Sequence, residues 1–82
     1  MNEAFITFRS VTFAQRGESV MRRAGIGCSL RRTPKHLEQR GCGYSMGLRL
    51  QELPRAKALL EQEGVPYRKV YQADRNGALR EL

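Results

Sequence analysis

Two segments with helical spacing of apolar residues, each closed by a glycine, constrain the fold of this chain more than any other feature. The first segment follows Ser10 and is closed by Gly25, and the second opens at Pro54 and is closed by Gly64. In each, apolar residues recur at three- and four-residue steps, which places them on one face of an amphipathic helix. Serine is a good N-cap, and glycine favours the left-handed turn that stops a helix. The spacing therefore predicts two helices.

Short strand-like segments flank both helices. Residues 4–9, 26–32, 44–50 and 67–71 are rich in β-branched or aromatic residues, or alternate between apolar and polar, as strands do. The predicted order is β-α-β-β-α-β. This order favours an α+β fold of the ferredoxin-like kind, a sandwich in which a four-stranded sheet carries two helices on one face. The alternative is a compact α/β layer with another strand order.

One domain accounts for the whole chain, because 82 residues build only one small core. We expect residues 1–72 to form this single small α+β domain. The run 74–77, Asp-Arg-Asn-Gly, has the chemistry of a polar turn. Residues 73–82 are therefore expected to form a mobile C-terminal tail.

Basic residues are concentrated in the first part of the chain. The formal net charge is +7, and nine of the 15 Lys and Arg but only three of the 8 Asp and Glu lie in residues 1–50. A field of this sign attracts anions of any kind, including nucleic-acid phosphates, an acidic protein surface or a small anionic species. Charge alone therefore leaves the partner open.

Cys42 lies in the same basic part, between Gly41 and Gly43. Flexible backbone on both sides opens the sulfur to a partner and can direct amide N–H groups toward it. Nearby cations favour the thiolate and so lower the pKa of a cysteine. The cations closest in sequence are Arg31, Arg32, Lys35, His36, Arg40 and Arg49. We expect a reactive thiol at Cys42, and the alternative is a buried cysteine that packs as a small hydrophobic residue.

The second cysteine, Cys28, is expected to have a structural role, because it lies on the apolar side of the predicted strand 26–32. A disulfide with Cys42 is the alternative. Neither a Cys-x-x-Cys pair nor a Cys/His set with zinc spacing is present, so the sequence predicts no metal and no cofactor. His36 is expected on a solvated helix surface rather than in a Cys-His nucleophilic pair, since no third orienting residue is evident.

Four short motifs follow one another along the chain: Ala24-Gly25-Ile26, Thr33-Pro34, Cys42-Gly43 and Gly64-Val65. Together with the runs 30–34 and 44–50, their order resembles the family called putative Se/S carrier protein-like over much of the chain. The chain departs from that family at residues 39–41, Gln-Arg-Gly, where serines are common. It departs again at residues 44–47, Tyr-Ser-Met-Gly, where a small apolar run is common.

The resemblance implies a carrier of reduced sulfur or selenium rather than an enzyme in its own right. Cys42 would hold the chalcogen as a persulfide or selenyl sulfide. Gly41 and Gly43 would give access and backbone donors, and Arg40 with neighbouring cations would hold the anion. Three cations would form a docking patch for an acidic donor: Arg31, Arg32 and Lys35. The implied partners are a cysteine desulfurase-like donor and a sulfur or selenium acceptor protein.

Two other classes of function stay open. A basic ferredoxin-like domain can present exposed aromatic residues to nucleic acid, but this chain has three Phe, three Tyr and no Trp, and Phe5 and Phe8 fall on opposite faces. A regulatory or scaffold domain would form homo-oligomers through an open sheet edge or face, with the cysteine incidental. The sequence contains no run of about twenty apolar residues and begins without the pattern of a signal peptide. We therefore expect no membrane partner and a cytoplasmic location.

Overall fold

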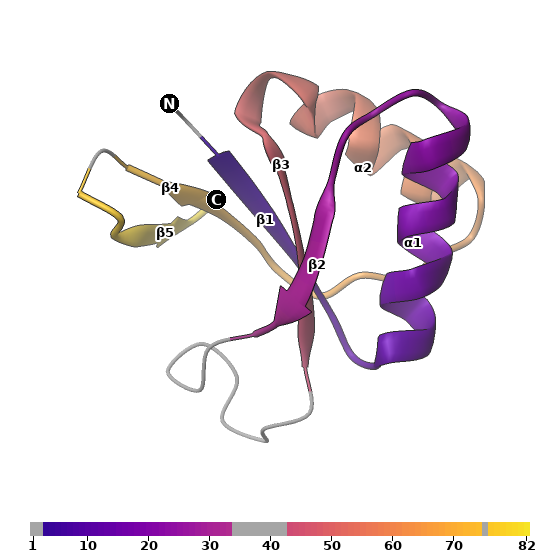
Figure 1. Cartoon of the computed structure of the whole chain (residues 1–82), viewed down its shortest axis with the longest axis horizontal. Helices are drawn as coiled ribbons and strands as arrows, with labels where there is room; N and C mark the ends of the chain where they lie inside the picture. Colours follow the sequence, from indigo (N-terminus) through magenta and orange to yellow (C-terminus); the bar gives the residue numbers. More distant parts are fainter. Residues whose placement is uncertain (1–2, 34–42, 75) are drawn as a thin grey trace.

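The computed structural model describes residues 3–33, 43–74 and 76–82. Within them the chain forms five strands, two α-helices and one 3₁₀ turn (Figure 1). In chain order the elements are β1 (Glu3–Phe8), α1 (Val11–Arg23), β2 (Ser29–Arg32), β3 (Tyr44–Arg49), η1 (Leu50–Glu52), α2 (Leu53–Gln62), β4 (Val70–Ala73) and β5 (Leu79–Glu81).

The five strands form one antiparallel sheet in the order β2-β3-β1-β4-β5. Both helices lie on one face of this sheet, to the right in Figure 1, so the molecule has a sheet layer and a helix layer. The predicted α+β class with two helices is confirmed. The prediction of a four-stranded sheet is wrong, because β5 pairs with β4 and adds a fifth strand.

β5 lies in the segment that the sequence predicted as a mobile tail. Asp74 organises the turn before it, since Oδ1 accepts hydrogen bonds from the backbone N–H groups of Asn76 (2.8 Å) and Ala78 (2.9 Å). Gly77 has a φ of 82°, which favours glycine. The polar run therefore closes a hairpin, and the three residues of β5 are too few to show a strand pattern in the sequence. The domain boundary at residue 72 and the mobility of the tail stay predictions.

The boundaries of α1 follow from its capping residues. The Ser10 side chain accepts a hydrogen bond from the Phe13 N–H over 3.3 Å, and Gly25 follows the last turn with a φ of 76°. Gly17 lies on the buried face, where an added Cβ would come within 3.0 Å of Phe8 Cζ. The helix can therefore approach the sheet closely because this position has no side chain.

The hydrophobic core fills the space between the two layers. Its largest fully buried side chains come from the sheet and from both helices: Phe8, Ile6, Met21, Met46 and Leu60. Burying such a side chain contributes about 1.5–3 kcal/mol. Two apolar residues of the alternating segment 44–50 face this core in β3, Met46 and Leu48, which are 0% and 4% exposed.

Two predicted strands begin three residues later in the structure than in the sequence pattern, β2 at Ser29 and β4 at Val70. Before β4 the reason is a bulge in the ladder. The Thr7 N–H donates to the Lys69 carbonyl over 2.8 Å, and the Thr7 carbonyl accepts the Arg68 N–H over 2.8 Å, so two residues lie opposite Thr7. The Thr7 hydroxyl accepts the Lys69 N–H over 2.9 Å, which the bulge would otherwise leave unpaired. The helix surface on which His36 is expected lies outside the described residues.

Candidate functional site

The structure describes three of the predicted site residues. Arg31 and Arg32 are exposed at the end of β2, and Gly43 is buried immediately before β3. The other five lie outside the described residues: Cys42, Gly41, Arg40, Lys35 and His36. Their roles stay predictions, and the geometry below concerns the residues around them.

Thr33 and Gly43 meet directly at the end of the β2–β3 ladder. The Thr33 N–H donates to the Gly43 carbonyl oxygen over 3.0 Å, one step beyond the last register pair, Arg32 and Tyr44. Both residues are buried. Because Cys42 is peptide-bonded to Gly43, the residue that follows the predicted thiol is held by the sheet.

The Thr33 side chain is a feature that the sequence reasoning missed. Thr33 is 6% exposed, and its buried Oγ1 has no hydrogen-bond partner among the described residues. Most buried hydroxyls are hydrogen-bonded, and an unpaired one costs about 1–3 kcal/mol. One sequence signal could have indicated the position of Thr33. If the predicted strands 26–32 and 44–50 pair antiparallel over their full length, residue 33 falls opposite residue 43.

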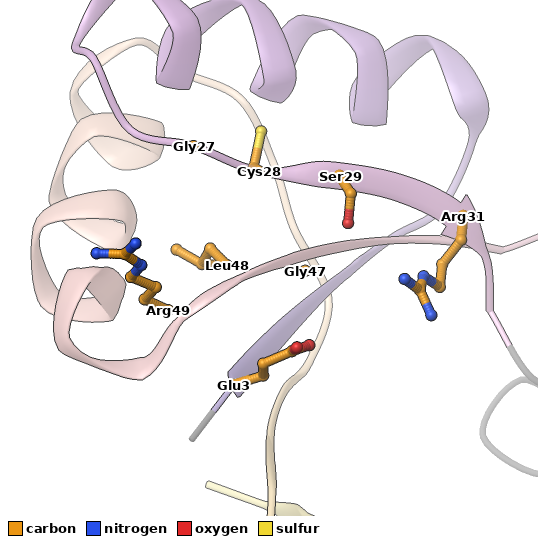
Figure 2. A pocket seen from close by; sticks show the side chains of 8 residues that line it. All are labelled: Glu3, Gly27, Cys28, Ser29, Arg31, Gly47, Leu48 and Arg49. Atoms are coloured by element: carbon orange, nitrogen blue, oxygen red, sulfur yellow. The ribbon is translucent and has the colours of Figure 1, made fainter. Parts of the chain in front are cut away.

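Cys28 immediately precedes β2 and is partly buried, packed against the core. Figure 2 shows its sulfur on the side of the chain that faces α1. Burial raises the pKa of the Cys28 thiol above its ordinary value, the Glu18 carboxylate raises it further, and the Arg22 guanidinium acts in the opposite direction. The thiolate of Cys28 is therefore less populated than that of a solvated cysteine.

A shallow hollow of about 310 Å³ lies beside Cys28 (Figure 2). Its lining residues come from β1, β3 and the β2 strand with the residues before it: Glu3, Gly27, Cys28, Ser29, Arg31, Gly47, Leu48 and Arg49. The register places Ser29 opposite Gly47, and Gly47 opposite Phe5. A Cβ on Gly47 would come within 3.1 Å of the Phe5 ring and 3.3 Å of Ser29 Oγ. Because Gly47 has no side chain, the bottom of the hollow is not filled.

The arginines around the hollow form no ion pair with a described residue. Each ion pair within the described part of the chain lies elsewhere: Glu18 with Arg22, Glu63 with Arg23, Glu52 with Arg55, and Glu81 with Lys69. Arg31, Arg32 and Arg49 are all exposed. Among the described residues, this end of the sheet therefore presents three arginine side chains to solvent, together with one carboxylate, that of Glu3.

The aromatic side chains do not form an exposed stacking platform within the described residues. Phe8 is 0% exposed on the helix side of β1, and Tyr71 is 6% exposed. Phe5, on the opposite side of β1, is partly buried. Recognition of single-stranded nucleic acid by a sheet depends on bases stacking on accessible aromatic rings. The described surface gives no specific support to that alternative.

Two further observations bear on the kind of site. The described residues contain no group of three or more His, Cys, Asp or Glu side chains placed to hold a metal ion. Neither described helix combines the length and the apolar character needed to cross a bilayer.

Comparison with known proteins gave one match. The model of the family described as Putative Se/S carrier protein-like matches residues 3–72 of this chain. The match begins with β1 and ends within β4, so it includes both helices, the Thr33–Gly43 pair and the segment between them. No curated protein and no solved structure matches the chain.

Proposed function

Because this chain belongs to the Putative Se/S carrier protein-like family, we propose that it carries sulfur or selenium between proteins on Cys42, as a persulfide or a selenyl sulfide. The family match is the observation that carries this proposal. It supports the class of cargo, and the chemistry of the two cysteines supports the choice of residue.

Cys28 is poorly suited to carry the cargo. A carrier cysteine must reach a sulfur on another protein, and it reacts as the thiolate. Burial raises the pKa of Cys28, and its side chain packs against the core on the α1 side. The chain has two cysteines, so the proposed carrier is Cys42, which stands between two glycines and follows a basic run.

The transfer step needs no oxidant, reductant or metal. The Cys42 thiolate attacks the outer sulfur of a donor persulfide, so a bond forms between Cys42 Sγ and that outer sulfur. The bond between the two donor sulfurs breaks, and its electron pair leaves with the donor cysteine as a thiolate. The outer sulfur keeps its proton or releases it to solvent. An acceptor thiolate repeats the same exchange on the Cys42 persulfide, which returns Cys42 to the reduced state.

The surrounding residues would assist this exchange in different ways. Gly41 and Gly43 leave room for the incoming persulfide, and backbone N–H groups can stabilise the anionic sulfur. Arg40 with neighbouring cations, His36 among them, would hold the anion. Three cations would form the surface that meets an acidic donor: Arg31, Arg32 and Lys35. The exposure of Arg31 and Arg32 and their lack of ion pairs with described residues support the docking role.

We further propose that the fold is a ferredoxin-like arrangement extended by β5. The strand order β2-β3-β1-β4 interleaves the strands of two strand-helix-strand units, as in that arrangement. We propose a cytoplasmic location, where thiols are kept reduced. The donor is a cysteine desulfurase-like protein, and the acceptor is a protein that uses sulfur or selenium.

Intact-mass spectrometry tests the function directly. The reduced protein is incubated without oxygen with a cysteine desulfurase and L-cysteine, desalted, and weighed, and peptide mapping then locates the added atom. We expect one sulfur atom on Cys42, no addition to Cys42→Ser, and normal addition to the matched variant Cys28→Ser. Addition to Cys28 in the wild type, or equal addition to both single variants, would contradict the assignment. Selenocysteine as the donor substrate tests selenium in the same way.

A further inference from the structure

The β2 edge of the sheet has backbone groups that could pair with another strand. β2 is the terminal strand of the sheet and pairs only with β3 within the described chain. The bond from Thr33 N–H to the Gly43 carbonyl oxygen fixes the alternation of the antiparallel ladder. Backbone groups of residues 29, 31 and 33 then point toward β3, and those of Leu30 and Arg32 point outward. The outer edge of β2 therefore offers alternating N–H and C=O groups to a partner.

The two edges of the sheet differ in charge. At β5, the Glu81 carboxylate pairs with Lys69 Nζ at 3.7 Å, and Arg80 donates to the Gln72 side chain over 3.5 Å. At β2, Arg31 and Arg32 are exposed and form no ion pair with a described residue. An acidic strand would therefore be attracted to β2 far more than to β5.

The hollow beside β2 adds a place for a side chain. It is lined by Gly27, Ser29 and Arg31 from the edge and by residues of β1 and β3. In strand addition, main-chain hydrogen bonds provide affinity, and hollows for alternate side chains provide specificity. The charged residues that line the hollow are two arginines, Arg31 and Arg49, and one carboxylate, that of Glu3, so the balance of charge favours an entering carboxylate.

We propose that the outer edge of β2 binds an extended acidic segment of the sulfur donor as an added strand. This inference rests on the proposed function, since it names how the donor docks. The added strand lies along β2 up to Thr33, the residue from which the chain leads into the segment that contains Cys42. Docking at this edge therefore brings the donor to the part of the chain that carries the reactive thiol.

A second copy of this chain is a weaker occupant. Two β2 edges paired with each other would bring arginines of one copy beside arginines of the other, and like charges across a strand pair are destabilising. The case for nucleic acid at this edge is also weaker. Phosphates bind to positive charge, and this binding does not use the unpaired backbone groups of an edge strand.

A synthetic peptide tests the docking without any sulfur transfer. The probe is a fluorescein-labelled peptide in which Glu or Asp alternates with Val or Thr, and the control probe replaces the acids with Gln or Asn. Binding is measured by fluorescence anisotropy to Cys42→Ser, so that the carrier thiol plays no part. We expect Arg31→Glu and Arg32→Glu each to weaken binding about tenfold or more, and Arg80→Glu on β5 to leave it within about twofold. Equal losses of peptide affinity from the β2 and β5 substitutions would overturn the proposal.

A matched pair of variants separates charge from backbone. Arg32→Ala removes only the side-chain charge, whereas Arg32→Pro also removes an N–H that points outward. We expect the proline variant to bind about fivefold more weakly than the alanine variant, the effect of one lost hydrogen bond. Equal binding by the two variants would contradict strand addition and favour a purely electrostatic contact, as with nucleic acid.

Amide hydrogen exchange of the wild-type protein, with and without the peptide, tests the docking site without any substitution that could alter the fold. We expect the peptide to protect the amides of Leu30 and Arg32 and to leave those of β5 unchanged. Protection at β5, or protection at β2 that develops with protein concentration in the absence of peptide, would overturn the proposal, the second in favour of a dimer.

The peptide can then be given a terminal cysteine persulfide. Docking without transfer would reject the proposed function alone, and transfer that does not need the β2 edge would reject the docking alone.

Discussion

The backbone N–H of Thr33 donates to the carbonyl oxygen of Gly43 over 3.0 Å, one pair beyond the last residues of β2 and β3. The chain thus leaves the sheet at one buried residue and returns to it at another, directly opposite. Cys42 is covalently attached to the second of these residues. The thiol that we propose as the carrier is in this way attached directly to a residue that the sheet holds.

The unpaired hydroxyl of Thr33 predicts an unusual response to mutation. Thr33→Val keeps the shape and removes a buried Oγ1 that has no partner among the described residues, so we expect it to raise the free energy of unfolding by about 1 kcal/mol. The matched control is Thr7→Val, since Thr7 is equally buried but accepts from the Lys69 N–H at 2.9 Å. Thr7→Val should lower the free energy of unfolding by about 1–2 kcal/mol. Urea denaturation of both variants measures the contrast, and similar losses in both would show that Thr33 is hydrogen-bonded after all.

The environment of Cys28 predicts slow alkylation. Because burial raises the pKa of the thiol, the thiolate fraction at a given pH is smaller in the folded chain than in the unfolded chain. We expect iodoacetamide to react with Cys28 in Cys42→Ser several-fold more slowly at about pH 8 than after denaturation. The difference should shrink as the pH rises above the pKa of the folded thiol. A second comparison uses Cys28→Ser, in which Cys42 should react faster, and the reverse order would exchange the roles of the two cysteines.

The contact between α1 and the sheet predicts that Gly17→Ala is destabilising. Alanine normally favours a helix over glycine by about 1 kcal/mol, but here its Cβ would lie 3.0 Å from Phe8 Cζ. The Phe8 ring is 0% exposed and has little room to move, so overpacking should dominate and lower the free energy of unfolding by about 1–2 kcal/mol. The control is Gly27→Ala, whose Cβ meets nothing within 4 Å and which should be close to neutral. Thermal unfolding of both variants checks this, and a stabilised Gly17→Ala would refute the close packing.

The mobility predicted for residues 73–82 can be measured by hydrogen exchange. β5 is short, with Arg80 and Glu81 exposed, and few buried contacts hold it. We expect amides of Leu79–Glu81 to exchange faster than those of β1, and Asp74→Ala to accelerate them further because it removes two turn hydrogen bonds. Exchange as slow as in β1 would instead make β5 an integral part of the domain.

Periodicity and capping residues were sufficient for α1, which Ser10 and Gly25 delimited, because a helix with one buried face repeats its apolar residues with the period of its backbone. In β3 the apolar alternation indicated Met46 and Leu48, but Ser45 and Gly47 on the other face are buried as well. β5 gave no such signal, since three residues cannot establish a period. The start of β4 was also misplaced, because Arg68 and Lys69 both bond to the Thr7 backbone in a bulge that interrupts the regular ladder there.

For the site, the order of short motifs along the chain was enough to indicate the family, and the family match bears this out. The local surroundings of Cys42 in the sequence, glycines and cations, remain the basis for its proposed reactivity. The hollow beside Arg31 was not foreseeable, because it depends on Gly47 lying between Ser29 and Phe5, which belong to separate strands.

The sequence alone determined the two helices and the family, because helical periodicity, capping residues and short motifs each depend on residues close together along the chain. Only the tertiary structure decided that Thr33 lies buried opposite Gly43, that Cys28 packs toward α1, and that β2 is a cationic edge strand that pairs only with β3 among the described residues. Those features depend on which segments become neighbours in space, and burial and desolvation are properties of that packing rather than of any one segment.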